Sequence, residues 1–284
     1  MIDGIHCIAH DDSLENIMHS PKLQFANYPN RTEAKYKGLI ITIYKESMSC
    51  HLRGSIHKFK NDGLHNADLF TYQDFVSALK KLELELEIYS KDLYVIKFEI
   101  GVNVPLGYPV YECINTVVFI NNKMPIKTTY NMLVTYQQYS IKVYSKSKQY
   151  PMFKTDNLLR IEIAYDRKVK LTKDICKIGI LNELLNPSIW KKMADVLREL
   201  VAKFVFFDYS EIKKEALPIE EFSIFNEWSN PIRASQEYNK TRRFRYKKLA
   251  YEIYLKYSKD TKAKHLIKLV DEKLDEMLPF EATR

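Results

Sequence analysis

Two glutamates, a tyrosine, a histidine and a lysine stand in strand-like segments and are of types that could share one reaction: His57, Glu99, Tyr144, Lys146 and Glu162. Two carboxylates and an imidazole suit a divalent cation, and oxygen ligands favour Mg²⁺ or Mn²⁺ over zinc. A tyrosine beside that cation could attack a phosphodiester. Nearby lysines could lower the pKa of Tyr144 or neutralise charge developing on the phosphate.

Strand alternation predicts that these side chains share a surface, because residues two apart lie on the same side of a strand. Between residues 95 and 104, Lys97, Glu99 and Asn103 lie opposite an apolar face. In the next two strand-like segments the polar sides carry Lys142, Tyr144 and Lys146, and Arg160 and Glu162. In residues 51–59, His57 shares a side with Arg53 and Ser55. If the strands form one sheet, the candidate residues converge.

Each candidate also has an ordinary structural explanation. A carboxylate on a strand is usually just solvated, a strand tyrosine usually packs, and a single histidine is usually hydrogen-bonded rather than a ligand. Periodicity alone therefore leaves an enzyme as a minority hypothesis.

The elements that position these residues change in kind along the chain. Residues 37–44, 51–59, 93–104, 111–120, 139–146 and 158–165 have the pattern of strands, and residues 72–88 that of a helix. From Leu181 the apolar spacing becomes helical, with stripes near residues 190–204, 246–257 and 267–277, and residues 218–231 are expected to connect. No internal repeat is visible. We expect an α+β protein with an antiparallel sheet domain at 1–180 and a helical region at 181–284.

Composition restricts the setting. The net charge of +8 makes nucleic acid a plausible partner. No stretch is long and apolar enough to cross a membrane, and the N-terminus lacks the features of a secretory signal. The four cysteines lie far apart, without the paired spacing of a zinc site. We expect a cytoplasmic protein with reduced thiols and no membrane association.

A basic, aromatic segment follows residue 233. Its cations are candidate DNA contacts on a helix that could lie along duplex phosphates: Lys240, Arg242, Arg243, Arg245, Lys247 and Lys248. A solvated helix face explains the same pattern equally well. The later helical stripes are more typical of core or self-association surfaces than of cofactor sites.

The order of four segments resembles the replication initiators of filamentous phages and related phage and plasmid proteins, and more distantly those of staphylococcal-type rolling-circle plasmids. The segments are GSIHKFKN, VIKFEIGVNV, YSIKVYSKSKQY and LLRIEIAYD, and the resemblance covers about residues 37–170. The His-hydrophobe-His element of many rolling-circle initiators is absent, as in the filamentous-phage-like branch.

The resemblance implies a fold related to the His-hydrophobe-His nucleases and a role for each matched residue. Tyr144, in Val-Tyr-Ser-Lys, would be the nucleophile, and Glu162, in Leu-Arg-Ile-Glu, a metal ligand. Glu99, in Lys-Phe-Glu, would be a second ligand at a position where relatives often have Asp, and His57 a third. Lys146 would assist catalysis, and Lys142 and Arg160 would contact DNA.

The implied activity is site-specific nicking that starts rolling-circle replication. Tyr144 would form a 5′-phosphotyrosyl link, with Mg²⁺ or Mn²⁺ at the site, and free a 3′-OH for the host polymerase. No P-loop is present, so a host helicase would unwind the DNA. A homodimer and a second participating tyrosine stay open, although strand phase favours Tyr144 as first nucleophile.

Two alternatives remain at this stage. A non-catalytic origin-binding or copy-control protein would keep the fold without the chemistry. A metal-dependent nuclease with water as nucleophile would cut DNA without a covalent intermediate.

Overall fold

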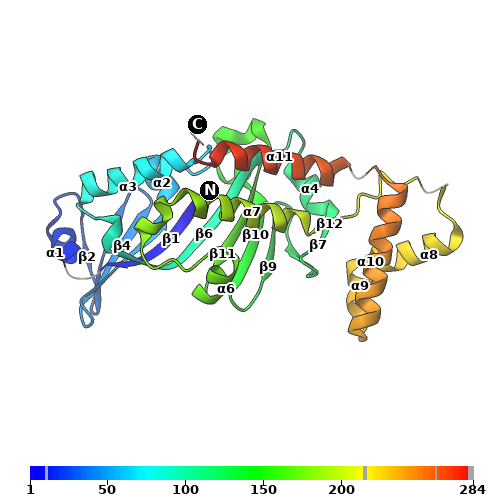
Figure 1. The fold of residues 1–284 in the computed structure, drawn as a ribbon, viewed down its shortest axis with the longest axis horizontal. Helices are drawn as coiled ribbons and strands as arrows, with labels where there is room; N and C mark the ends of the chain where they lie inside the picture. The colour runs from blue at the N-terminus through cyan, green and yellow to red at the C-terminus, as the bar shows by residue number, and fades with distance from the viewer. Residues whose placement is uncertain (10–11, 214–215, 260, 281–284) are drawn as a thin grey trace.

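The computed structural model describes residues 1–9, 12–213, 216–259 and 261–280, and these form the expected α+β fold (Figure 1). Ten strands make one sheet in the order β2-β3-β4-β5-β1-β6-β11-β10-β9-β8, with neighbouring strands antiparallel. A separate pair joins β12 to β7. The strands are β1 Ile2–Ala9, β2 Ala26–Asn27, β3 Arg31–Tyr36, β4 Leu39–Tyr44, β5 Ser49–Ser55, β6 Leu93–Pro105, β7 Val117–Ile120, β8 Ile126–Lys127, β9 Asn131–Thr135, β10 Tyr139–Ser145, β11 Leu158–Tyr165 and β12 Phe204–Phe206.

Helices follow and cover the strands. They are α1 Asp12–His19, α2 Ile56–Lys60, α3 Tyr72–Leu86, α4 Val110–Thr116, α5 Lys146–Gln149, α6 Lys168–Asp174, α7 Pro187–Ala202, α8 Ile219–Trp228, α9 Pro231–Gln236, α10 Lys240–Tyr257 and α11 Thr261–Met277, with 3₁₀ turns at Ser90–Asp92, Pro151–Asp156 and Leu181–Leu185. Local signals set several ends. Thr71 and Asp74 form a capping box at the start of α3, and α7 begins with Asn186 as N-cap and a proline in its first turn.

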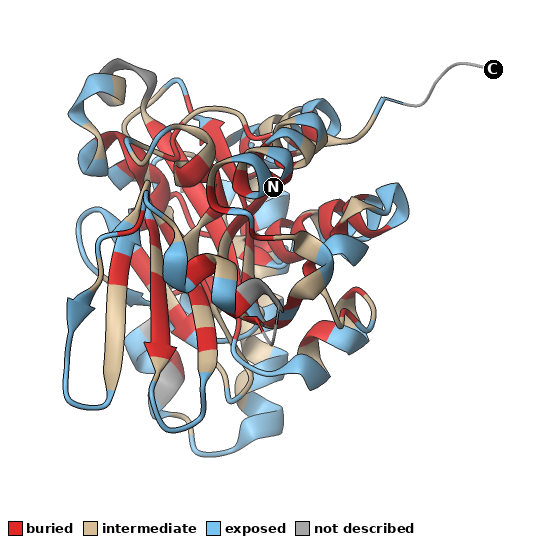
Figure 2. Ribbon diagram, turned by 90° about the vertical axis from the view of Figure 1, so that its left-hand side faces the viewer, coloured by how far each residue is buried: buried red, intermediate tan, exposed pale blue. Residues whose placement is uncertain are grey.

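The core lies between the sheet and the helices on one of its faces. Apolar side chains of α3, α7 and α11 join those of the strands in one buried cluster. The strand residues that point into it alternate with the polar ones, as in Ile141 and Val143 of β10 and Ile161 and Ile163 of β11. Figure 2 shows buried residues between sheet and helices and exposed ones at the hairpin ends. The opposite face is therefore left to polar side chains.

The two halves of the sheet have the same connectivity, which no sequence pattern had indicated. Strand β1, helix α1 and strands β2 to β5 are repeated by β6, α4 and β8 to β11, and the halves meet where β1 pairs with β6. One shift of 100 residues superposes the registers of the outer strands: Ala26 opposes Glu33 as Ile126 opposes Leu133, and Thr32 opposes Ile43 as Met132 opposes Val143. The protein thus contains an internal structural repeat.

The same registers assign equivalent positions in the inner strands. Across the first half, Thr42 opposes His51, which opposes Ile8; across the second, Lys142 opposes Glu162, which opposes Gly101. One row further, Arg53 opposes His6 as Ala164 opposes Glu99. The equivalent pairs are therefore Tyr44 with Tyr144, His51 with Glu162, His6 with Glu99, Arg53 with Ala164 and Ile8 with Gly101.

Three expected elements differ from the structure. Residues 111–120, expected as one strand, form most of α4 followed by β7. Residues 51–59 are a strand only as far as Ser55, whose hydroxyl caps α2 by accepting from the Lys58 N–H. The expected connector at residues 218–231 contains α8. Strand β1, at the centre of the sheet, was not expected at all.

The division at residue 180 separates strand-rich from helix-rich sequence, but the core crosses it. Helices α7 and α11 belong to the core of the sheet. A second, smaller cluster joins α8, α9 and α10 to Val118, Phe119 and Phe207, and these helices lie together at one end of the molecule (Figure 1). No helix among the described residues is long and apolar enough to cross a membrane.

Candidate active site

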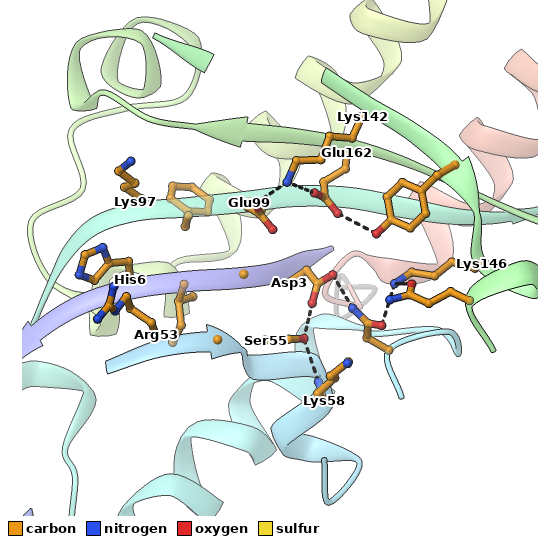
Figure 3. Close-up of a pocket in the computed structure, with 17 residues that line it drawn as sticks. Asp3, His6, Arg53, Ser55, Lys58, Lys97, Glu99, Lys142, Lys146 and Glu162 are labelled. Carbon is orange, nitrogen blue, oxygen red and sulfur yellow. Dashed lines mark hydrogen bonds and ion pairs between the residues drawn. The ribbon is translucent and has the colours of Figure 1, made fainter. Parts of the chain in front are cut away.

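A cavity of about 700 Å³ opens on the polar face of the sheet, where the two halves meet. Its lining comes from β1, β5, β6, β10 and β11 and from the loops and turns beside them (Figure 3). Among the predicted residues it contains Glu99, Lys142, Tyr144, Lys146 and Glu162. Of the five residues expected to converge, Glu99, Tyr144, Lys146 and Glu162 therefore line one cavity, and Lys142 lines it with them.

A buried ion pair lies beneath the cavity. Arg160 is 2% exposed, and its guanidinium donates to Asp3 Oδ2 at 3.0 Å, Glu162 Oε2 at 3.2 Å and Asn103 Oδ1 at 3.1 Å. Burial alone would raise the pKa of Asp3, but the charge of Arg160 and hydrogen bonds from Ser55 and Asn66 hold it well below its usual range. Arg160 thus positions carboxylates instead of meeting DNA, which corrects the expectation of a DNA contact at this residue.

Lys142 links the two predicted metal-binding carboxylates. Its Nζ lies 2.9 Å from Glu99 Oε1 and 3.1 Å from Glu162 Oε1. Burial opposes its charge, but Glu162 and Glu99 hold the pKa of Lys142 above its ordinary value. Burial and the charge of Glu162 raise the pKa of Glu99. Two carboxylates therefore share one cation in a partly desolvated site.

Tyr144 contacts this pair directly. Its hydroxyl donates to Glu162 Oε2 at 3.3 Å. Burial raises the pKa of Tyr144 well above its ordinary value, and the opposing effect of Arg160 does not compensate. The expectation that lysines lower this pKa is thus wrong for the structure as it stands, and Tyr144 is a neutral phenol at pH 7. Four other tyrosines near it in the sequence are absent from the described lining of the cavity: Tyr136, Tyr139, Tyr150 and Tyr165.

Lys146 lies at the start of α5, directly after the last residue of β10. It is 1% exposed, and its Nζ donates to Asn66 Oδ1 at 2.7 Å and to Gln149 Oε1 at 3.0 Å. Burial, and then the charge of Arg160, lowers the pKa of Lys146 to about 7. Its Nζ stands 5.2 Å from the centre of the Tyr144 ring. The lysine is therefore close to the tyrosine and able to give up a proton near neutral pH.

Two glycines make room for these charged groups. A Cβ on Gly101 would lie 3.0 Å from the Arg160 guanidinium and 2.6 Å from the carbonyl oxygen of Ile161. A Cβ on Gly4 would lie 2.5 Å from Glu99 Oε2. Any larger residue at either position would have to displace the ion pair or the carboxylate.

His57 does not reach the cavity. It lies in α2, is 1% exposed, bonds Asp68 Oδ1 through Nε2 at 2.6 Å and stacks on Phe70 at 4.5 Å between ring centres. Burial lowers the pKa of His57 against the opposing effect of Asp68. The predicted side of the strand was wrong for this residue because the strand has already ended, and the structure gives it a packing role.

The residues that the sequence analysis missed are Asp3 and Asn66. Asp3 lies on β1, where a register shift between Ile2 and Ile5 breaks the alternation that would have marked the strand. Asn66 lies in the loop after α2, bonds both Asp3 and Lys146, and carries no periodic signal. In the sequence, Asp3 stands between Ile2 and Gly4, a context that does not mark it as a site residue.

The carboxylates fit one mode of binding a divalent cation. Within the described ranges no group of three or more His, Cys, Asp or Glu side chains is placed to hold a metal ion. Mg²⁺, however, is commonly held by one or two carboxylates together with water and substrate phosphate. Glu99 and Glu162 offer such a pair of oxygen donors around the position now taken by Lys142. Asp3 is already committed to Arg160.

The basic segment forms α10, as predicted, at a distance from the cavity (Figure 1). Four of its cations, Lys240, Arg243, Lys247 and Lys248, line a hollow of about 320 Å³ together with Phe244 and Tyr251 of α10 and residues near β7 and β12. Arg242 lies 3.5 Å from Glu237, and Arg245 is exposed. Burial, and then Arg243, lowers the pKa of Lys247 to about 8. The helix presents a basic and aromatic surface.

No protein-family model matches the chain, and no curated protein does. Among solved structures, the rolling circle replication initiator protein from Geobacillus stearothermophilus matches with a TM-score of 0.42 and 13% sequence identity, over 77% of this chain and 91% of that one. A TM-score of this size does not establish a shared fold. The function proposed below rests on the residues of the cavity and on the order of the sequence motifs.

Proposed function

We propose that this protein initiates rolling-circle DNA replication by nicking one strand, with Tyr144 as the nucleophile. The observation that carries the proposal is the bond from the Tyr144 hydroxyl to Glu162, inside a cavity that also holds Glu99, Lys142 and Lys146. Three of the four motifs that resemble phage and plasmid initiators contribute Glu99, Tyr144 and Glu162 to that cavity. A tyrosine on a sheet without such partners would be a packing residue.

The reaction exchanges one phosphodiester for another. The Tyr144 oxygen forms a bond to phosphorus while the bond from phosphorus to the 3′-oxygen breaks, and the electron pair leaves with that oxygen. Glu162 Oε2, 3.3 Å from the hydroxyl, accepts the tyrosine proton. Lys146, with its pKa near 7, supplies a proton to the leaving 3′-oxygen. The products are a 5′-phosphotyrosyl link and a free 3′-OH, and the reverse reaction rejoins the strand.

Glu99 and Glu162 would hold Mg²⁺ or Mn²⁺ in this proposal. The cation would polarise the phosphate and offset its charge, which is the chemistry that such ions supply in phosphoryl transfer. Lys142 performs the charge-balancing part of this role in the structure, since it lies between the same two oxygens. The Lys142 side chain is 39% exposed, so it could turn from the carboxylates toward DNA in the cavity.

DNA would extend from the cavity in more than one direction. A second hollow of about 520 Å³ shares Lys142, Tyr144 and Gln149 with the first and adds Tyr130, Asn131 and Lys148. Tyr130 offers a ring on which a base could stack, and Lys148 carries a charge beside that ring. Helix α10 would bind duplex phosphates nearby in the origin. Host helicase and polymerase would act on the nicked product. The protein would act at the origin as a homodimer.

The test is a denaturing gel of the protein incubated with Mn²⁺ and single-stranded oligonucleotides from the origin region of its own replicon. We expect an SDS-resistant DNA adduct from the native protein and none from Tyr144→Phe. The internal repeat provides a matched control, because Tyr44 is the equivalent tyrosine of the first half and Tyr44→Phe should still form the adduct.

Two results would replace the proposal. Cleavage without an adduct, unchanged in Tyr144→Phe, would indicate a nuclease with water as nucleophile. Binding of the oligonucleotides with neither cleavage nor adduct would indicate a non-catalytic origin-binding protein.

A further inference from the structure

The cavity has a second end, which the proposed chemistry does not use. We call the group His6, Arg53 and Lys97 the distal end. His6 on β1 opposes Arg53 on β5 and Lys97 on β6, so the three side chains form a row across adjacent strands. Figure 3 shows them together at one end of the cavity and Lys146 at the other, with Glu99 and Glu162 between.

Arg53 has hydrogen-bond donors that the protein does not use. Its Nε is buried without an acceptor, and among the residues that the structure describes its hydrogen bond is a long contact of 3.4 Å from Nη2 to Thr42 Oγ1. It forms no ion pair with any residue that the structure describes. Arg160, at the other end, is bonded to three side chains. A buried N–H donor without an acceptor is costly, so an acceptor brought by a ligand would stabilise Arg53.

The surroundings of Arg53 favour an anion. His6 Nε2 lies 2.9 Å from His51 Nδ1, and burial, then His51, Arg53 and Lys97, lowers the pKa of His6 to about 4. The imidazole is therefore neutral at pH 7 and can bond a ligand without repelling the neighbouring cations. Lys97 bonds Asp166, and both side chains are exposed to solvent, so Lys97 can exchange this partner for a ligand. The carboxylates that line the cavity are Asp3, Glu99 and Glu162, and a cation binds each of them.

The internal repeat gives this contrast a specific form. The positions of Glu99 and Glu162 in the second half are those of His6 and His51 in the first. Ala164 of the second half is replaced by Arg53. Equivalent positions that offer carboxylate oxygens to a cation in the second half therefore offer imidazole nitrogens in the first.

We propose that the distal end binds a phosphate of single-stranded DNA, several nucleotides from the phosphate that Tyr144 attacks. The inference rests on the proposed function and adds a second point at which the strand is held. Tyr144 and Asn103 both neighbour Arg160, and from Asn103 back to Lys97 along β6 the rise of a strand gives about 20 Å. A strand that crosses the cavity would thus be gripped at both ends.

The test measures binding of fluorescent thymidine oligonucleotides of increasing length, without metal so that no cleavage intervenes. For the native protein we expect affinity to rise by about tenfold or more at the length that first reaches both ends. Arg53→Gln should lose this step while the shortest oligonucleotides bind as before, and Arg53→Lys should keep part of it. Arg53→Gln should also lower the slope of log affinity against log salt by about 0.7, the value for one phosphate contact in a single strand.

A matched control removes an equal charge elsewhere on the same half. Arg31 lies on β3, pairs weakly with Glu33 and does not line the cavity, so Arg31→Gln should keep the step. The proposal is overturned if Arg53→Gln weakens all lengths equally, if it leaves the step in place, or if circular dichroism shows that both Arg53 variants are folded and both lack any effect. Competition by inorganic phosphate, with no length step, would assign the distal end to a free anion and overturn the DNA assignment.

Failure here is separate from failure of the proposed function. If the native protein forms the tyrosine adduct and the length step is absent, only the distal end is refuted. If the step is present and no adduct forms, the strand is held at two points without being nicked, and the catalytic proposal fails instead.

Discussion

In the second half of the sheet, Glu99 and Glu162 line the same cavity as Tyr144; at the equivalent positions of the first half stand His6, His51 and Tyr44. The tyrosine of the second half donates to a carboxylate, whereas the ring of Tyr44 meets His51 edge-on at 4.9 Å between ring centres. One backbone plan thus supports a site with a proton acceptor for the phenol and another without a carboxylate. Both halves have the tyrosine and the strand, and only the second has the acids. The proposed chemistry therefore depends on the acids.

The largest expected effect comes from removing the acid that Tyr144 contacts. Glu162→Gln should lower the nicking rate by about 10²–10⁴-fold, because the amide cannot take the tyrosine proton. His51→Gln, at the equivalent position, should leave the rate within a factor of a few. Single-turnover rates on an origin oligonucleotide measure both. Equal losses in the two variants would show that the halves are not divided as proposed.

The two halves also depend on each other, because the first half supplies Asp3 to the buried ion pair with Arg160 of the second half. Asp3→Asn should lower the free energy of unfolding by about 3–5 kcal/mol, since it leaves the charge of Arg160 buried with one fewer partner. Glu199→Gln, which breaks an exposed pair with Lys203, should cost less than about 0.5 kcal/mol. Urea titrations at pH 7 measure both changes, and a cost for Asp3→Asn as small as that of the control would contradict the ion pair's role.

The pH dependence of this stability has a defined sign. The folded pKa of Asp3 is depressed, so its contribution is complete above the unfolded pKa near 3.8 and is lost as pH falls from there toward the folded pKa. Below about pH 4 the native protein should therefore lose stability more steeply than Asp3→Asn does.

The two halves also differ at the position of Gly101, where the expected effect of a substitution is smaller. Gly101→Ala should destabilise by about 1–3 kcal/mol and slow nicking, because the added Cβ meets the Arg160 guanidinium and a backbone oxygen. Its equivalent in the first half is Ile8, which has a full side chain in a row without such an arginine. Ile8→Ala should change stability by about 1 kcal/mol and leave nicking intact. Thermal unfolding and nicking rates compare the two, and unaltered nicking in Gly101→Ala would argue that Arg160 tolerates displacement.

Strand phase predicted Glu99, Lys142, Tyr144 and Glu162 at one surface because β6, β10 and β11 alternate regularly where those residues lie. It failed for His57 because Ser55 ends the strand by capping α2, a choice that depends on a single hydroxyl. It missed Asp3 because an irregular register in β1 breaks the alternation. Strand alternation thus predicts side-chain direction where a strand is regular, and fails where the strand ends or its register shifts.

The internal repeat escaped detection for a different reason. At the shift of 100 residues, residues 31–44 retain few identities with residues 131–144, namely Tyr36 with Tyr136, Ile41 with Ile141 and Tyr44 with Tyr144. The positions that differ include those that carry charge, such as Thr42 against Lys142. Backbone register preserved the relationship after the side chains had diverged, and only the structure contains the register.

The smallest expected effect concerns the proton that leaves with the 3′-oxygen. If Lys146 supplies it, the nicking rate should fall about tenfold per unit as pH rises above about 7, because the ammonium is lost with a pKa that burial and Arg160 have lowered. Lys146→Arg should remove this decline between pH 6 and 9, since a guanidinium stays charged throughout. Lys58 offers a control, because it is another lysine that lines the cavity, and Lys58→Arg should leave the profile unchanged. The first half has no buried lysine in the turn after Tyr44. The lysine of that turn, Lys45, is exposed and bonds the carbonyl of Tyr28. A decline that persists in Lys146→Arg would therefore transfer the acid role to another group of the second half and leave Lys146 as a support for Asn66.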